Sequence, residues 1–98
     1  MEKKSQAFQI VKGSFIIKND RGLHTRPSTE IVRCSTAFKS EIVFVYQKHR
    51  VNAKSILGVL MLAAEKGAKI RIEARGRDAA AAVESLIQLA ENRFNIHY

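Results

Sequence analysis

The stretch DRGLHTRPSTEIV, residues Asp20–Val32, decides how the first third of the chain folds. Its first residues break the strand that precedes them. Pro27, the only proline in the chain, suits the first turn of a helix, where its missing N–H costs no hydrogen bond. Apolar and small residues then recur at steps of three and four, which predicts a helix from about Thr25 to Ala37. His24 therefore stands at the mouth of a helix, with Arg26 two residues further on.

This position surrounds the imidazole of His24 with positive charge. Unpaired N–H groups and the helix dipole supply part of it, and Arg26 adds a full charge. Because both disfavour a protonated ring, we expect a lowered His24 pKa and a neutral, nucleophilic imidazole at neutral pH. The same donors suit a dianionic group. One interpretation is a histidine that accepts a phosphoryl group and passes it on; the other is a polar cap beside a solvated arginine.

Alternation and helical spacing predict the rest of the fold. The predicted strands cover Ser14–Lys18, Ser40–Tyr46, Arg50–Asn52 and Ala68–Ala74. A second helix begins after Ser55 as its N-cap and ends by Gly67, and a third begins after Asp78 as its cap. The order β-α-β-β-α-β-α predicts an α+β fold with helices on one sheet face and a wetter opposite face.

The same patterns assign residues to the core. Ile70 and Ile72 of the last strand should face inward, and Val59 and Ala63 should be the inward residues of the second helix, whereas Ile56 and Leu60 are ambiguous. The third helix carries an apolar stripe of Ala79, Ala82, Val83, Leu86, Leu89, Ala90 and Phe94.

Length and composition limit the function classes. The 98 residues predict a loose arm over residues 1–9 and a single domain over residues 10–98. The longest apolar run, ILGVLMLAA, is about half the length of a membrane span, so we expect no insertion in a membrane. The single cysteine, Cys34, allows no intramolecular disulfide, which suits a reducing cytoplasm. His49, His97 and Cys34 lack metal-ligand spacing, so neither a metal nor a cofactor is predicted.

The net charge of +8, from 17 Lys and Arg against 9 Asp and Glu, leaves several interpretations open. It favours a nucleic-acid binder, a protein with an acidic partner or anionic substrate, or simple solubility. The sequence offers neither an aromatic stacking platform nor a glycine-rich binding loop, so nucleic-acid binding is the weakest of these.

Three segments carry a resemblance that covers about Ile10 to Phe94. GLHTRPSTEIV, FKSEIVF and AKSILGVLMLAAEKGAKIRIEARGRDAAAAVESL together resemble HPr, the histidine-containing phosphocarrier of the bacterial phosphoenolpyruvate-dependent phosphotransferase system. The resemblance implies an open-faced sandwich, in which a four-stranded antiparallel sheet carries three helices on one face.

The resemblance also implies a role for each residue of the opening motif. Enzyme I, charged from phosphoenolpyruvate, would phosphorylate His24 on Nδ1, and the phosphoryl group would pass to an Enzyme IIA domain. Arg26 matches the arginine that steadies the phosphoryl group, and Pro27 matches the proline that starts the helix. Such a protein is a cytoplasmic relay that acts only with partner enzymes, and not an enzyme by itself.

Two further implications concern regulation and docking. Ser55 matches the serine that the ATP-dependent HPr kinase/phosphorylase modifies, although a plain N-cap would also explain it. The residues that match the partner-docking surface are Leu23, Thr25, Ile56, Leu57 and Leu60. A regulatory carrier that signals without sugar transport is the alternative function.

The chain departs from the family at the residue before the glycine. Arg21 stands where a small polar residue usually helps to position the histidine, and Asp20 could pair with Arg21 or raise the His24 pKa. Ile16, Val43 and Val45 add apolar surface to the open sheet face, which suits either a weak dimer or packing in a crystal. We nevertheless expect a monomer.

Overall fold

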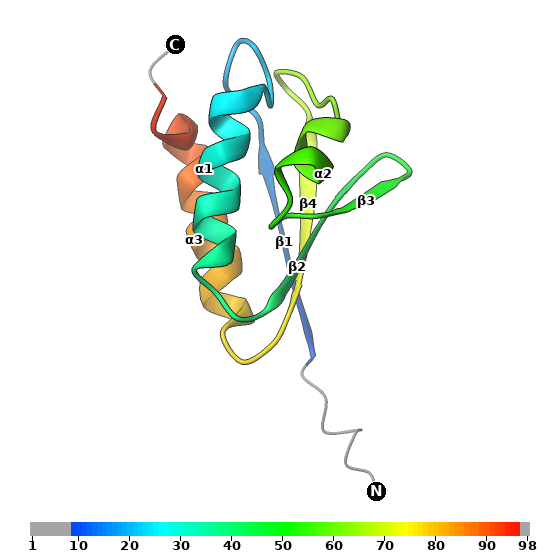
Figure 1. The fold of residues 1–98 in the computed structure, drawn as a ribbon, viewed down its shortest axis with the longest axis vertical. Coiled ribbons are helices and arrows are strands. Elements are labelled where there is room, and N and C mark those ends of the chain that lie inside the picture. The colour runs from blue at the N-terminus through cyan, green and yellow to red at the C-terminus, as the bar shows by residue number, and fades with distance from the viewer. Residues whose placement is uncertain (1–8, 97–98) are drawn as a thin grey trace, which may run out of the picture.

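The computed structural model describes residues 9–96 and has the element order that the sequence predicts (Figure 1). Its elements are β1 (Ile10–Ile16), α1 (Thr25–Thr36), β2 (Glu41–Tyr46), β3 (His49–Asn52), α2 (Ile56–Met61), β4 (Lys69–Arg75), α3 (Ala79–Glu91) and a closing 3₁₀ turn, η2 (Arg93–Asn95). The expected arm over residues 1–9 lies outside the described residues except for Gln9, so the domain boundary stays a prediction.

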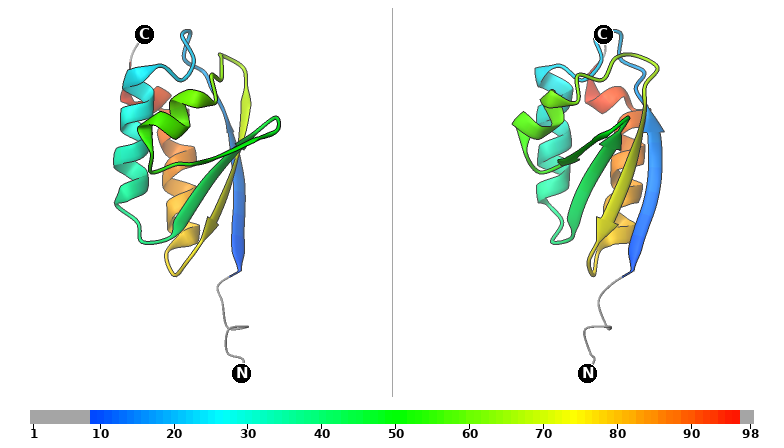
Figure 2. Two further views of the ribbon diagram at one scale, coloured as in Figure 1. Left: turned by 45° about the vertical axis from the view of Figure 1, so that its right-hand side comes forward. Right: turned by 90° about the vertical axis from the view of Figure 1, so that its right-hand side faces the viewer.

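The four strands form one antiparallel sheet in the order β1-β4-β2-β3. All helices lie on one side of this sheet, and the other side is open (Figure 2). The expected open-faced sandwich is therefore confirmed. None of the helices within residues 9–96 has the length and apolar character that a membrane span requires.

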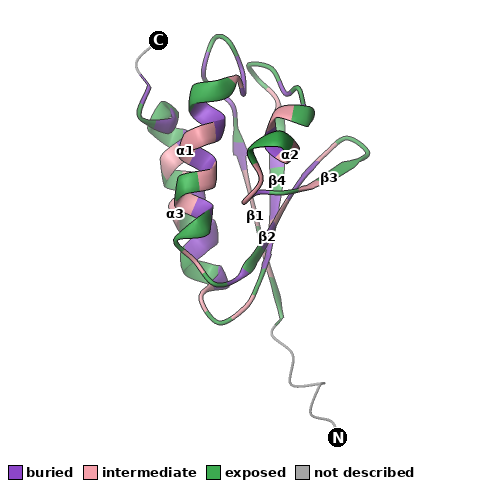
Figure 3. Cartoon of the chain, in the orientation of Figure 1, coloured by how far each residue is buried: buried purple, intermediate pink, exposed green. Residues whose placement is uncertain are grey.

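The core fills the space between the sheet and the helices (Figure 3). Phe15 of β1 packs edge-on against Phe44 of β2, with 5.4 Å between the ring centroids. Ile70 and Ile72 of β4 face inward as predicted and are fully buried. Burial of each such side chain contributes about 1.5–3 kcal/mol to folding.

β1 begins four residues earlier than Ser14, where the sequence pattern placed its start. The strand pairs with β4 at every position from Ile10↔Arg75 to Ile16↔Lys69. The sequence pattern did not predict the residues before Ser14 as strand because Gly13 has low strand propensity. It is needed there, since a Cβ on Gly13 would lie 2.6 Å from a methyl group of Val83, where α3 crosses the sheet closely.

α2 ends at Met61, well before the predicted end at Gly67. Val59 is buried as predicted, but the prediction that Ala63 faces inward is wrong: Ala63 is exposed and has a positive φ of 50°. After the helix, Leu62 and Ala64 are the buried residues. The chain thus leaves the helix early and turns toward the loop that carries His24.

The apolar stripe of α3 is largely confirmed. Its buried members are Ala79, Ala82, Val83, Leu86 and Ala90, and Leu89 is half-buried. Phe94 lies beyond the helix in η2, whose residues all have positive φ angles. There it packs edge-on against Phe15 at 5.9 Å between ring centroids, so the C-terminal turn is anchored to the core.

Asp78 stands at the N-cap of α3, but its side chain does not cap that helix. One carboxylate oxygen accepts the N–H of Lys39 at 2.9 Å, and the other accepts the N–H of Ser40 at 3.0 Å and the Ser40 hydroxyl. These donors, above all the Ser40 hydroxyl, lower the Asp78 pKa to about 2. Asp78 therefore joins the loop before β2 to the loop after β4.

These hydrogen bonds of Asp78 predict a loss of stability in acid. Because the folded pKa lies below the ordinary value of 3.8, ionised Asp78 stabilises the fold above about pH 4, and this contribution is lost as pH falls toward 2. Urea unfolding of Asp78→Asn should show a lower midpoint than wild type at pH 6 and a much smaller difference at pH 2.5. A difference that is independent of pH would contradict the assignment.

Candidate functional site

His24 is the N-cap residue of α1 and has an extended backbone (φ −82°, ψ −166°). Its carbonyl accepts the N–H of Ser28 at 3.1 Å, which is the first hydrogen bond of the helix. Its imidazole does not cap the helix, unlike the side chains that usually occupy this position. Pro27 lies in the first turn, as predicted, and is buried. The ring thus lies beside the helix N-terminus and makes no capping hydrogen bond to it.

Backbone hydrogen bonds on both sides hold the loop before His24. The N–H of Gly22, at φ +67°, bonds to the Asn19 carbonyl at 3.0 Å. The N–H of Leu23 bonds to the carbonyl of Ala64 at 3.0 Å, in the segment that follows α2. The segment after α2 therefore helps to hold His24 in position at the start of α1.

Asn19 is a further support of this loop, and the sequence analysis did not identify it. Its side chain is fully buried, and its Nδ2 donates to the carbonyl of Arg93 at 3.1 Å. The bond joins the His24 loop to η2, 74 positions away in the chain. The only sequence signal was a small polar residue three positions after β1, which also fits an ordinary turn.

The environment of His24 lowers its pKa, as expected. Burial of the ring is the largest cause, followed by the charges of Arg21 and then Arg26. Nε2 lies on the buried side of the ring. Both arginines are exposed, and neither forms an ion pair with another residue of the described range 9–96.

The sequence-based alternatives for Asp20 are wrong. Asp20 pairs with Lys66, with 2.9 Å between Oδ1 and Nζ, and not with Arg21. The Asp20 pKa is lowered mainly by this hydrogen bond. Arg21, the departure from the family pattern, therefore has no ion-pair partner among the described residues. Its positive charge acts on His24 and lowers the His24 pKa.

An NMR titration of His24 should test this electrostatic account. The His24 pKa in the wild-type protein is expected below 6.5, and Arg21→Gln should raise it because one nearby positive charge is removed. Arg33→Gln is the control, since Arg33 is not among the charges that act on His24. An unchanged His24 pKa in Arg21→Gln would contradict the account.

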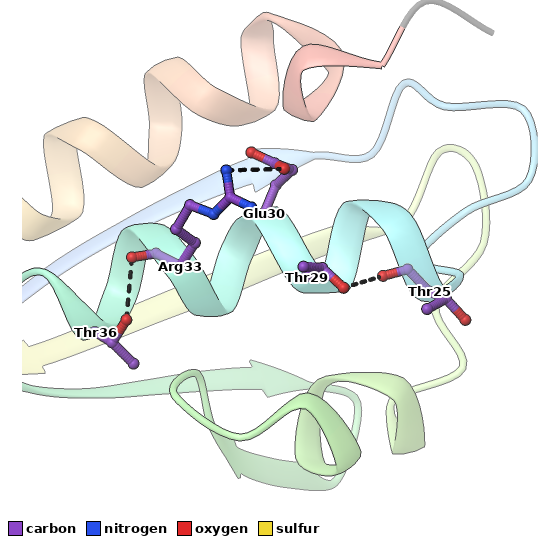
Figure 4. Close-up of polar contacts among 5 residues, drawn as sticks. All are labelled: Thr25, Thr29, Glu30, Arg33 and Thr36. Atoms are coloured by element: carbon purple, nitrogen blue, oxygen red, sulfur yellow. Dashed lines mark hydrogen bonds and ion pairs between the residues drawn. The ribbon is translucent and has the colours of Figure 1, made fainter.

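Several polar side chains of α1 contact neighbouring residues of the same helix (Figure 4). Thr29 donates to the carbonyl of Thr25 at 2.9 Å, and Thr36 donates to the carbonyl of Arg33 at 3.1 Å. Arg33 and Glu30 approach to 3.8 Å, and such an exposed pair contributes little stability. Thr25 is exposed, as a docking residue must be.

Ser55 is the N-cap of α2, as predicted. Its Oγ accepts the N–H of Gly58 at 3.0 Å, and its backbone N–H donates to Asn52 at 3.0 Å. The side chain is half-buried. The hydroxyl therefore sits at the start of α2, directly before the apolar residues of that helix.

Three apolar side chains of α2 form an exposed surface, which we name the α2 patch: Ile56, Leu57 and Met61. Leu57 and Met61 are each 68% exposed. Met61 was not predicted from the sequence, although its position one helical turn after Leu57 could have indicated it. Leu60 is half-buried at the edge of the patch. α2 packs beside α1, whose N-cap residue is His24.

Leu23 requires a correction as a docking residue. It is 4% exposed and belongs to the core, so its side chain is not available to a partner. Its backbone instead serves the site: the carbonyl accepts the hydroxyl of Ser28 at 3.4 Å, and the N–H bonds to Ala64.

The cysteine and the potential metal ligands are not gathered at this site. Burial raises the pKa of Cys34, which opposes formation of its reactive thiolate. Within residues 9–96, no group of three or more His, Cys, Asp or Glu side chains is placed to hold a metal ion.

Comparisons with known proteins agree with this geometry. The family model described as "PTS HPr component phosphorylation site" matches residues 11–92. A phosphocarrier protein HPr from Xylella fastidiosa (strain 9a5c) is 38% identical over 86 residues, covering 88% of this chain and 97% of the relative. One from Neisseria meningitidis serogroup A is 41% identical over 85 residues, covering 87% and 96%.

Solved structures give the same result. A crystal structure of HPr from Thermoanaerobacter tengcongensis superposes with a TM-score of 0.85 at 33% identity, covering 90% of this chain and 99% of that one. HPr from Bacillus anthracis superposes with a TM-score of 0.79 at 32% identity, covering 83% and 96%. This chain belongs to the HPr family, the phosphocarrier proteins of the phosphotransferase system.

Proposed function

We propose that this protein accepts a phosphoryl group on His24 from Enzyme I, charged by phosphoenolpyruvate, and passes it to an Enzyme IIA component. The observation that carries the proposal is the position of His24: its ring stands at a helix N-terminus, does not cap the helix, and faces the charges of Arg21 and Arg26. This arrangement combines a nucleophile with an anion site.

The transfer uses the neutral form of the ring. A lowered pKa keeps the imidazole deprotonated at neutral pH, so one nitrogen carries a free electron pair. The burial of Nε2 favours Nδ1 as the attacking atom. Nδ1 bonds to phosphorus while the bond between phosphorus and the donor protein breaks, and the proton on Nε2 stays in place.

Arg26 and the first turn of α1 stabilise the transferred group. The guanidinium donates charge-assisted hydrogen bonds to the phosphoryl oxygens, and the free N–H groups of the turn add partial positive charge. Each dipole contribution amounts to roughly 0.3–1 kcal/mol at an exposed site. Such modest stabilisation suits a carrier, since the group must leave again for the next protein.

Docking would use the α2 patch together with Thr25 and Leu60. Leu57 and Met61 offer the largest exposed apolar area beside His24, and apolar contacts of this kind supply affinity in transient complexes. The surrounding positive charge would steer partners with acidic surfaces. The partners in this proposal are Enzyme I, Enzyme IIA and HPr kinase/phosphorylase.

Ser55 would regulate this docking as a phosphorylation site of the ATP-dependent HPr kinase/phosphorylase. A phosphate on its Oγ would lie at the start of α2 and directly precede Ile56 of the α2 patch. The added negative charge would repel an acidic partner and hydrate the apolar surface.

A regulatory role without sugar transport is the second candidate. It is favoured by the similarity to Crh, a catabolite repression protein of Bacillus subtilis, with a TM-score of 0.69 at 30% identity. That structure and one HPr structure from T. tengcongensis are described as dimers. For this chain we propose a monomer in the bacterial cytoplasm, where it acts together with its partner enzymes.

Phosphoryl transfer in solution tests the proposal. The purified protein is mixed with Enzyme I of the same organism, phosphoenolpyruvate and Mg²⁺, and its intact mass is measured. We expect a gain of one phosphoryl group that disappears in acid and survives in base, as phosphohistidine does. An acid-stable label, or no label with folded protein and an active Enzyme I, would refute the carrier role.

A further inference from the structure

The open face of the sheet concentrates positive charge. Alternate residues of the strands point away from the helices, and among them are five exposed cations: Lys12, Arg50, Lys69, Arg71 and Arg75. The same face carries two carboxylates, those of Glu41 and Glu73. The net charge of this surface, which we name the outer face, is therefore three positive.

Most of this charge is not neutralised inside the protein. Arg50 pairs with Glu73, with 2.8 Å between Nη2 and Oε1, and Lys12 stands opposite Glu73 in the register. Arg71 acts on the same carboxylate through space. Lys69 and Arg75 form no ion pair with any residue of the described range 9–96.

Apolar side chains are interleaved with these cations. Ile10 and Ile16, at the two ends of β1, are 42% and 44% exposed. Ile10 and Val43 line a hollow of about 170 Å³ together with four charged side chains, those of Arg50, Arg75, Glu41 and Glu73. Val45, expected as open apolar surface, is instead buried between the register positions of Arg50 and Arg71.

We propose that the outer face is a second docking surface, which binds an acidic protein segment independently of His24. The guanidinium groups suit carboxylates because they bind them with two parallel hydrogen bonds. The hollow at Val43 and the exposed Ile10 offer apolar contact beside that charge. Apolar contact on a face with five cations against two carboxylates fits a protein partner with acidic residues around an apolar one.

The same features disfavour a nucleic acid. The aromatic residues of the described strands, Phe15, Phe44 and Tyr46, all pack on the core side, so the outer face has no platform on which bases could stack.

The outer face lies on the opposite side of the sheet from the helix layer that holds α1 and α2 (Figure 2). A partner on the outer face would therefore leave the α2 patch and His24 accessible. The carrier could stay attached to one acidic protein while it exchanges its phosphoryl group with others.

Charge-neutralising variants test this surface. Binding of labelled poly-L-glutamate is measured by fluorescence anisotropy for wild type, for Arg71→Gln/Arg75→Gln and for the control Arg33→Gln/Lys39→Gln, which removes equal charge from α1 and the loop after it. We expect a loss of about tenfold for the outer-face variant and less than about twofold for the control. Phosphoryl uptake should stay unchanged in the outer-face variant, which separates this inference from the proposed function.

Two further measurements complete the test. Amide shift mapping with poly-L-glutamate should move signals of β1 and β4 and leave those of α2 in place. Equal losses in both double variants, or shifts centred on α2, would overturn the proposal. Binding to oligothymidylate that is tighter than binding to poly-L-glutamate would overturn the proposal in favour of a nucleic-acid partner. Tighter binding to phosphatidylcholine vesicles containing phosphatidylglycerol would overturn it in favour of a membrane surface.

Discussion

His24→Ala is expected to lose phosphoryl uptake from Enzyme I by more than about a thousandfold, because the substitution removes the nucleophile itself. The fold should survive, since the imidazole does not cap α1 and the backbone hydrogen bonds of Gly22 and Leu23 do not involve it. Circular dichroism and urea unfolding establish that the variant is folded. The rate of label transfer from phosphoenolpyruvate is the measurement.

His49→Ala is the matched control. His49 is an exposed histidine on β3 and has neither a helix N-terminus nor a flanking arginine pair like that of His24. Its removal should leave the rate of phosphoryl uptake unchanged within about twofold. Retained label in His24→Ala, or lost label in His49→Ala, would show that the phosphoryl group is carried by another residue.

Local sequence patterns predicted the parts of the site that depend on neighbours in the chain. The helix start at Thr25 near Pro27, the N-cap at Ser55 and the inward residues of β4 all follow from spacings of a few positions. The placement of His24 at the mouth of α1 follows from the same short-range signals, because a helix start is marked by the residues on either side of it.

Contacts between residues far apart in the chain could not be predicted from local sequence patterns. Asn19 meets Arg93 across 74 positions, and Asp78 meets Ser40 across 38, so no local period can reveal either pair. Asp78 has the residue type and position of a helix cap, yet loop donors outcompete the helix for its carboxylate. Such choices depend on how the tertiary fold brings loops together.

The connection between α2 and the His24 loop has a consequence for function. Ala64 follows α2 in the chain and holds Leu23 through a backbone hydrogen bond, while Ser55 caps the start of the same helix. The proposed docking surface and the proposed phosphoryl site are therefore held by the same segment of the chain. A distortion at this junction should disturb both stability and transfer.

Gly22→Ala is the substitution that distorts this junction most directly. Gly22 has a φ of +67°, and a Cβ there would lie 2.4 Å from the carbonyl oxygen of Ala64 and 2.9 Å from Cα of Glu65. Both contacts are with backbone, which cannot rotate away as a side chain can. We expect a loss of about 3 kcal/mol or more in unfolding free energy, from backbone strain and steric overlap together.

Gly67→Ala isolates the strain from the overlap. Gly67 also has a positive φ, of +91°, but a Cβ there would meet nothing within 4 Å. Its cost should therefore be limited to about 1–2 kcal/mol of backbone strain. In thermal unfolding, Gly22→Ala should lower Tm by more than about 10 °C, and Gly67→Ala by clearly less.

Phosphoryl uptake distinguishes the two variants a second time. The overlap in Gly22→Ala pushes the loop away from Ala64, so the hydrogen bond of Leu23 is lost and His24 moves relative to the first turn of α1. A displacement of about 1 Å should cost about 10²-fold in transfer rate, measured at a temperature where the variant is folded. Gly67→Ala leaves that hydrogen bond in place and should transfer at close to the wild-type rate. Equal stability and equal transfer in the two variants would mean that the backbone at Gly22 does not set the position of His24.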